Sequence, residues 1–172
     1  VNDFIAAIEK AAANAKDLGA RANDKLGLGI VTSISDSKDA AEDAAGLAQA
    51  YTYYTATTYD AKGKITASVI DASQGKINFD TTGQITSDLN AEVKTKQELG
   101  FDYNMKDKSG IQKEWFEQAN AFAEYIKGKT AAEVKGISLN QGVPADADLK
   151  SSVTVHVTDF LTAIEKSSKN AK

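Results

Sequence analysis

The sequence predicts an α+β fold, with an antiparallel β-sheet and helices packed on one side of it. Short segments in the first half of the chain are rich in Ile, Val, Thr and Tyr and are bounded by turn residues, which is typical of strands. Segments in the second half carry apolar residues three and four positions apart, which is typical of amphipathic helices. Strands that come first and helices that follow favour separate layers over an alternating parallel sheet.

The sheet is expected to contain four segments, residues 28–35, 50–59, 65–71 and 76–79. The turn at residues 60–64 contains Gly63, which suits a positive φ, so the second and third segments should form a hairpin. Gln74 and Gly75 should separate the last two segments. Residues 36–46 are alanine-rich and acidic, and we expect a long connection or a short helix there. Tyr and Thr fill residues 50–59, which indicates either cross-strand pairs or a face for a carbohydrate or aromatic ligand.

The main helix of the second half is expected over about residues 111–127. Ser109 and Gln112 have the spacing of a capping box, which predicts the start of this helix. Its apolar spacing places Trp115 and Phe122 on the buried face. A weaker helical pattern covers residues 87–99.

Two further helices are expected near the end of the chain. Thr130 and Glu133 have capping-box spacing and predict a short helix. The last helix should follow Thr154, because apolar residues then recur at helical spacing. These residues are Val157, Phe160, Leu161 and Ile164.

An internal repeat links the two ends of the chain. Residues 1–16 and 157–172 are identical at ten of sixteen positions, with an offset of 156 residues, which is about the length of one domain. We therefore expect residues 1–23 to be the C-terminal helix of a preceding repeat plus a linker, and residues 24–172 to be one complete domain. The apolar stripe of the first helix has no partner assigned to it, so this helix docks on the domain, docks on a neighbouring molecule or frays.

Composition excludes several classes of function. A net charge of -4 with a single arginine argues against a surface that binds nucleic acid. The absence of cysteine excludes disulfides, iron–sulfur clusters and thiol nucleophiles, and with one histidine we expect no metal site of the zinc type. No apolar run reaches the roughly 18 residues of a membrane span. The spacing of serine, histidine and carboxylates supports no hydrolytic site.

The most informative motif is Asp148, Ser151 and Thr154, which lie just before the last helix. Near a helix N-terminus, free backbone N–H groups and the positive end of the dipole stabilise a phosphate. A threonine at this place is therefore either an ordinary helix cap or a site for a phosphate group.

The spacing Asp-x-x-Ser-x-x-Thr resembles the acceptor motif of the FMN-binding domain family, found in subunits of sodium-pumping NADH:quinone reductase and Rnf complexes. In that family a flavin transferase joins FMN to the last threonine through a phosphoester. The resemblance implies covalent FMN at Thr154, with Asp148 and Ser151 completing the motif. Ser152 stands where the family has glycine and is a competing acceptor.

A broader resemblance covers most of residues 24–172. Residues 60–71, residues 97–115 and the helix that follows are similar to the PplA-like flavoproteins, surface lipoproteins of Gram-positive extracellular electron transfer. The family places a loop over the flavin, which nominates Tyr103, Met105, Gly110, Ile111 and Trp115 as its contacts. Plain core packing is the alternative for Met105 and Trp115.

The resemblance implies a redox carrier rather than a classical enzyme. Its partners would be a flavin transferase, a membrane NADH dehydrogenase or quinone pool as donor, and ferric iron or other acceptors. We expect it at the extracellular face of the membrane, held by a lipid anchor upstream of Val1. A second class stays open, namely a non-catalytic spacer or adhesin repeat that has lost its flavin. His156 is either a proton relay or a surface residue of the last helix.

Overall fold

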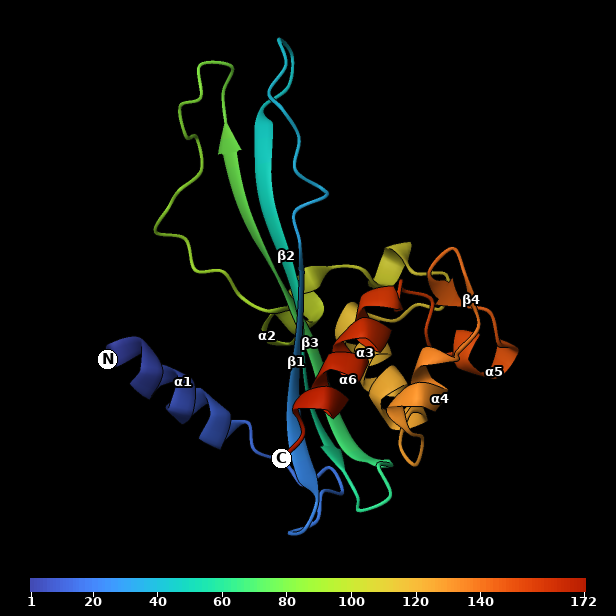
Figure 1. The fold of residues 1–172 in the computed structure, drawn as a ribbon. Helices are drawn as coiled ribbons and strands as arrows, with labels where there is room; N and C mark the ends of the chain where they lie inside the picture. Colours follow the sequence, from blue (N-terminus) through green and yellow to red (C-terminus); the bar gives the residue numbers. More distant parts are fainter.

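A three-stranded antiparallel sheet, ordered β1–β2–β3, forms the centre of the molecule (Figure 1). Its strands are β1 (Lys25–Ser33), β2 (Gly46–Tyr59) and β3 (Ile65–Phe79). The computed structural model describes all residues from Val1 to Lys172. The sheet with helices on one side confirms the predicted α+β class. The hairpin at residues 60–64 is also confirmed, and Gly63 has φ 74°.

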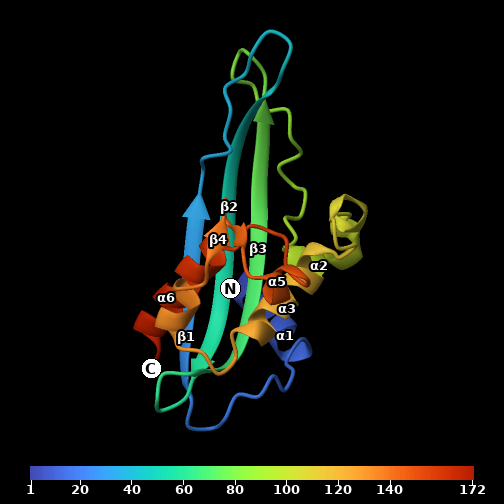
Figure 2. The same cartoon turned by 90° about the vertical axis from the view of Figure 1, so that its right-hand side faces the viewer.

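Short helices and one small hairpin follow the sheet. In chain order they are α2 (Lys96–Leu99), η1 (Gly100–Tyr103), η2 (Lys106–Lys108), α3 (Trp115–Tyr125), α4 (Ala131–Lys135), β4 (Leu139–Asn140), β5 (Val143–Pro144), α5 (Ala147–Lys150) and α6 (Thr158–Asn170). Figures 1 and 2 show α3, α4, α5 and α6 together on one face of the sheet. The first helix, α1 (Asn2–Ala13), lies on the other side.

The core forms around Phe160 of α6. Its ring makes edge contacts with three aromatic rings, at centroid distances of 5.7 Å to Tyr53, 5.7 Å to Trp115 and 5.5 Å to Phe122. Phe160 and Phe122 have no exposed area. The expected burial of Trp115 and Phe122 is therefore confirmed. One aromatic side chain thus joins β2, α3 and α6.

Helix α6 packs against β1 through two glycines. A Cβ atom at Gly29 would lie 1.9 Å from the carbonyl oxygen of Ala163, and one at Gly27 would lie 1.9 Å from that of Ser167. The absence of these side chains lets the helix backbone approach the strand. The position of α6 therefore depends on Gly27 and Gly29.

The outer edge of β1 is covered by the end of the chain. The carbonyl oxygen of Leu28 accepts a hydrogen bond from Asn170 Nδ2 at 3.1 Å, and that of Ile30 accepts one from Lys166 Nζ at 2.9 Å. Leu26 and Lys172 exchange two backbone hydrogen bonds, both 3.2 Å long. Three successive outward carbonyls of β1 therefore have partners from α6 and the residues after it.

Several predicted boundaries are wrong. Strand β3 runs through Gln74 and Gly75 without a break, because both pair with β2. Within residues 87–99 only α2 is helical. Of the two alternatives for residues 36–46, the long connection is the one that forms, up to the start of β2 at Gly46. The strands β1 and β2 also begin earlier than expected.

The predicted start of the main helix is also wrong. Gln112 has φ 53°, which a helix cannot contain, and α3 begins at Trp115 with Glu114 as its N-cap. Glu114 and Glu117 form the capping box there. The other expected capping box, between Thr130 and Glu133, is confirmed at α4.

Helix α1 forms as expected from the sequence but has no buried residue. Phe4 is 75% exposed, whereas Phe160, at the same position of the repeat, has no exposed area. Lys10 forms ion pairs with Glu98 and, at 3.8 Å, with Glu92. No helix of the chain has the length and hydropathy needed to cross a bilayer.

Candidate functional site

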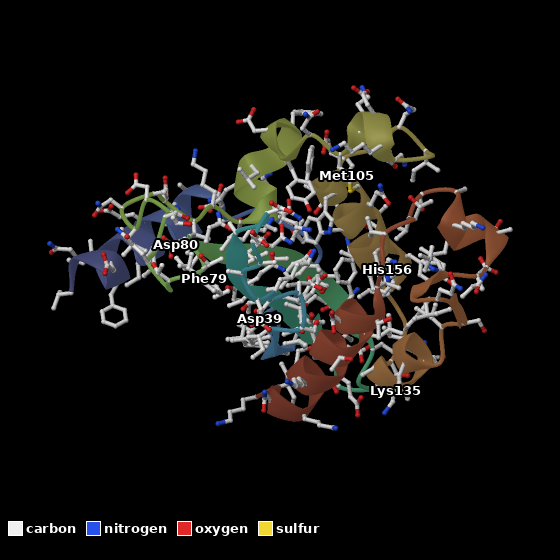
Figure 3. The ribbon with its side chains drawn as sticks, turned by 90° about the horizontal axis from the view of Figure 1, so that it is seen from above. Asp39, Phe79, Asp80, Met105, Lys135 and His156 are labelled. Carbon is white, nitrogen blue, oxygen red and sulfur yellow. The ribbon has the colours of Figure 1, made fainter.

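A cavity of about 550 Å³ lies between β2, the loop after α2, the start of α3 and the segment before α6. It is lined by Tyr51, Tyr53, Lys96, Tyr103, Met105, Lys108, Ser109, Gly110, Trp115, Thr154, Val155 and His156. Figure 3 shows Met105 and His156 on the same side of the molecule, although 51 positions separate them, 156 minus 105. A volume of this size is typical of a site for a cofactor or small molecule.

Five of the nine nominated residues meet at this cavity. Thr154, Tyr103, Met105, Gly110 and Trp115 all line it. They come from three separate stretches of the chain, so their meeting is a property of the fold. Trp115 also lies in the core and Met105 packs against it, so the core-packing alternative holds for both, and contact with a flavin stays a prediction.

The other four nominated residues do not line the cavity. Ile111 is half-buried outside it. Asp148 is exposed in the first turn of α5, while the hydroxyls of Ser151 and Ser152 donate to backbone carbonyls three residues before them. These three residues shape the turn that precedes Thr154. The nearest buried side chains, Leu149 and Val153, anchor that turn in the core.

Thr154 is not at a helix N-terminus, which corrects the expected source of phosphate stabilisation. Helix α6 begins at Thr158, and its N-cap Val157 makes no side-chain cap hydrogen bond. The free N–H groups of α6 therefore belong to later residues than Thr154. His156 lies in the irregular segment before the helix and not on a helix surface; the residue is exposed and lines the cavity.

Gln118 of α3 holds the Thr154 segment in place. Its Oε1 accepts hydrogen bonds from the backbone N–H of Thr154 at 2.8 Å, from that of Val155 at 3.1 Å and from the Thr154 hydroxyl at 3.2 Å. Its Nε2 donates to Ser109 Oγ and to the carbonyl of Lys113, both at 3.1 Å. Gln118 has no exposed area. One buried amide thus joins α3, the Ser109 loop and Thr154.

Glu114 holds the loop that covers the cavity. Its carboxylate accepts hydrogen bonds from the backbone N–H groups of Met105 at 2.9 Å and Lys106 at 3.0 Å. The same residue caps α3, and it is only 2% exposed. The loop and the helix start are therefore fixed by one carboxylate.

Lys96 is the most unusual group in the wall, because it is 4% exposed and carries an ammonium. Its Nζ donates to the hydroxyl of Tyr51 and lies 4.7, 4.4 and 4.9 Å from the ring centres of Tyr51, Tyr103 and Trp115. Burial, and to a smaller extent the charge of Lys76, lowers the pKa of Lys96 to about 7. Burial also raises the pKa of the Tyr51 and Tyr103 hydroxyls, so both stay neutral.

Gln118, Glu114 and Lys96 were missed in the sequence. Gln118 had a signal, because it lies three residues after Trp115 and four before Phe122, and so shares their face of the helix. A polar residue on an otherwise apolar face indicates a buried hydrogen-bond network. Glu114 and Lys96 had no such signal, because neighbouring charges are common in solvated loops.

No group of three or more His, Asp or Glu side chains lies close enough to hold a metal ion. A larger hollow of about 720 Å³ lies against the far part of β2 and β3, next to residues 88–94. It contains none of the nominated residues. The cavity at Thr154 is therefore the candidate site.

Comparisons with known proteins give one short match. A stretch of 41 residues, 24% of this chain, is 54% identical to part of chlorophenol reductase from Desulfitobacterium hafniense. The match spans 12% of the length of that protein. No family model matches this chain, and no solved structure matches it.

Proposed function

We propose that this domain carries FMN, joined through a phosphoester to Thr154, with its isoalloxazine ring in the cavity of about 550 Å³. It accepts electrons from a membrane NADH dehydrogenase or quinone pool and passes them to ferric iron or other extracellular acceptors. The observation that carries the proposal is the meeting of Thr154 with Tyr103, Met105, Gly110 and Trp115 around one cavity. A hydroxyl for attachment and a surface for the ring lie together there.

The lining suits a flavin chemically. The isoalloxazine ring needs an aromatic or aliphatic surface, and the aromatic side chains of Tyr51, Tyr103 and Trp115 line the cavity. The phosphate needs nearby positive or donating groups, and Lys108 and His156 line the same cavity as Thr154. These two side chains replace the helix N-terminus expected from the sequence.

Attachment would disturb the fold little. In the transfer, Thr154 Oγ attacks the phosphorus of a flavin dinucleotide, the pyrophosphate bond breaks, a nucleoside monophosphate leaves, and the hydroxyl proton is lost. The ester oxygen can no longer donate to Gln118, but that bond, at 3.2 Å, is the longest of the three that Gln118 Oε1 accepts. Both backbone N–H donors keep their partner. The segment can therefore hold its position after modification.

The 41-residue stretch that is 54% identical to this chain belongs to a protein named chlorophenol reductase, and it spans 12% of that protein. Electron carriage is in keeping with that name. The spacer or adhesin class has no comparable support from the cavity.

Intact-mass measurement after co-expression with a flavin transferase and magnesium tests the proposal. We expect an increase equal to FMN less one water, which survives denaturation. Thr154→Ala should abolish the increase, and Ser152→Ala, which removes the competing hydroxyl, should leave it unchanged. Flavin that is released on denaturation, or that maps to Ser152, contradicts the proposal. A protein that stays without flavin under these conditions supports the spacer or adhesin class.

A further inference from the structure

A buried lysine without an ion pair stands in the wall of the cavity. Lys96 takes part in none of the five ion pairs of the chain. The nearby carboxylate of Asp71 forms no ion pair with Lys96, and its Oδ1 accepts hydrogen bonds from the backbone N–H groups of Ala72 and Gln97. The Lys96 ammonium therefore has only the Tyr51 hydroxyl and three aromatic faces as partners.

Packing alone gives no reason for a lysine at this place. A methionine would fill a similar volume without the free-energy cost of burying a charge. Cation–π contacts with three rings lower this cost without removing it. A buried charge that borders a cavity and makes no ion pair suits a ligand that becomes negative there.

We propose that Lys96 stabilises the reduced form of the flavin by placing its ammonium against the ring, and so raises the reduction potential of the bound cofactor. This inference rests on the proposed function. Two electrons from the donor and one proton from solvent convert the neutral oxidised ring into a reduced ring with one negative charge, spread over its pyrimidine edge. A positive charge in a wall shielded from water offsets that charge more strongly than solvent does.

The surroundings favour Lys96 for this role over other charged groups. Lys108 and His156 also line the cavity but are exposed, so water screens their charges. Lys76 and Asp71 act on Lys96 in opposite directions, since Lys76 lowers its pKa and Asp71 raises it. Glu114 is fixed by its hydrogen bonds to the loop. Lys96 is therefore the buried cation next to the proposed ring site.

Spectroelectrochemical titration of the flavin-carrying protein tests the inference. Lys96→Met should shift the equilibrium between oxidised and reduced flavin toward the oxidised form by about tenfold or more, which for a two-electron couple equals about 30 mV. Lys96→Gln, the second neutral variant, should give the same shift. Lys96→Arg should keep the potential close to that of the unsubstituted protein. Lys106→Met is the matched control, because it removes one exposed positive charge from the same loop region and should leave the potential unchanged.

Intact mass is measured on every sample, so the two proposals fail in different ways. If all variants carry FMN on Thr154 and the neutral variants keep the unsubstituted potential, the role of Lys96 is wrong and the flavin proposal stands. If Lys106→Met shifts the potential as much as Lys96→Met, the effect is one of net charge and the inference is also wrong. If the unsubstituted protein takes up no flavin, both proposals are wrong.

Discussion

The side-chain amide of Gln118 accepts hydrogen bonds from three donors of the Thr154 segment, and Gln118 has no exposed area. Its carbonyl end accepts and its amino end donates, so both ends of the side chain are used. A leucine has a similar size but can do neither. Buried donors that lose their acceptor each destabilise the fold by roughly 1–3 kcal/mol.

Gln118→Leu is therefore expected to lower the free energy of unfolding by about 3 kcal/mol, mainly because the N–H groups of Thr154 and Val155 lose their acceptor. Urea unfolding measures this change. Gln84→Leu is the matched control, because the Gln84 side chain is exposed and only its backbone makes hydrogen bonds. Equal effects of the two substitutions would show that the Gln118 hydrogen bonds contribute little.

Lys96 gives a second prediction, on pH and stability. Its pKa is about 7 in the folded chain and near 10.5 when unfolded, so the unfolded state holds more protons between these values. The contribution of Lys96 to the free energy of unfolding must then rise with pH in this window, by on the order of 2 kcal/mol between pH 7 and pH 9. Lys96→Met should remove this rise.

The check is urea unfolding of both flavin-free proteins at pH 7, 8 and 9. The difference between the two proteins isolates Lys96, because other titrating groups contribute equally to both. Lys96→Met should be the more stable protein at pH 7, and its advantage should shrink toward pH 9. An advantage that stays constant with pH would mean that the pKa of Lys96 is not lowered.

At the scale of elements, α6 and α1 present one repeated sequence in two environments. Phe160 meets three aromatic rings in the core, while Phe4, its counterpart, lies in solvent. The sheet face and α3 supply the partners of α6. The difference between the two helices is therefore in what surrounds them and not in their own apolar stripe.

Phe160→Ala should destabilise the fold by about 3–5 kcal/mol, the usual cost of deleting a fully buried aromatic side chain. Phe4→Ala makes the same chemical change at the same repeat position and should change stability by less than about 0.5 kcal/mol. Thermal or urea unfolding of the two variants provides the comparison. A large effect of Phe4→Ala would mean that α1 packs on the domain in solution.

Gly29→Ala tests the contact between α6 and β1. The new Cβ would lie 1.9 Å from the carbonyl oxygen of Ala163, so the helix must move away from the strand. We expect a loss of stability of about 3 kcal/mol, at the upper end for overpacking. Gly75→Ala in β3 is the control, because the nearest atom to its new Cβ is 3.9 Å away, and it should be close to neutral. A mild effect of Gly29→Ala would show that α6 can shift without loss.

The elements also show how much the sequence could predict. The class, the hairpin, the buried faces of α3 and α6 and the capping box of α4 follow from local spacing, which a single segment contains. The start of α3 does not follow from local spacing, because the sequence offers one capping box at Ser109 and another at Glu114. Glu114 also accepts hydrogen bonds from the backbone N–H groups of Met105 and Lys106, which favours the second start. That advantage comes from residues eight and nine positions away along the chain.

Family resemblance predicts which distant residues lie together in the candidate site, because local sequence patterns do not contain this information. The resemblance groups Tyr103, Met105, Gly110, Trp115 and Thr154, and these five residues line one cavity in the structure. The burial of Lys96 depends on rings contributed by β2, η1 and α3, and no local pattern contains that arrangement.

For the whole molecule, the proposed domain boundary can be tested by truncation. Helix α1 has no buried residue and is tied to the rest only through the ion pairs of Lys10 and the linker. Exposed ion pairs contribute at most about 1 kcal/mol. A chain without residues 1–16 should therefore unfold in one cooperative transition, with nearly the same midpoint in urea. Loss of cooperativity would place the boundary elsewhere.

The covered edge of β1 has a consequence for association between molecules. An uncovered edge strand offers free backbone groups to a strand of another chain, which is a common route to aggregation. Here Lys166, Asn170 and Lys172 donate hydrogen bonds to the outward carbonyls of Ile30, Leu28 and Leu26, so these three carbonyls are not free to pair with an incoming strand. Lys166 and Asn170 stand at the repeat positions of Lys10 in α1 and of Asn14, the residue that follows α1. A helix of this sequence that docks on its own sheet thus shields the edge as well as filling the core, and neighbouring copies could lie close together without merging their sheets.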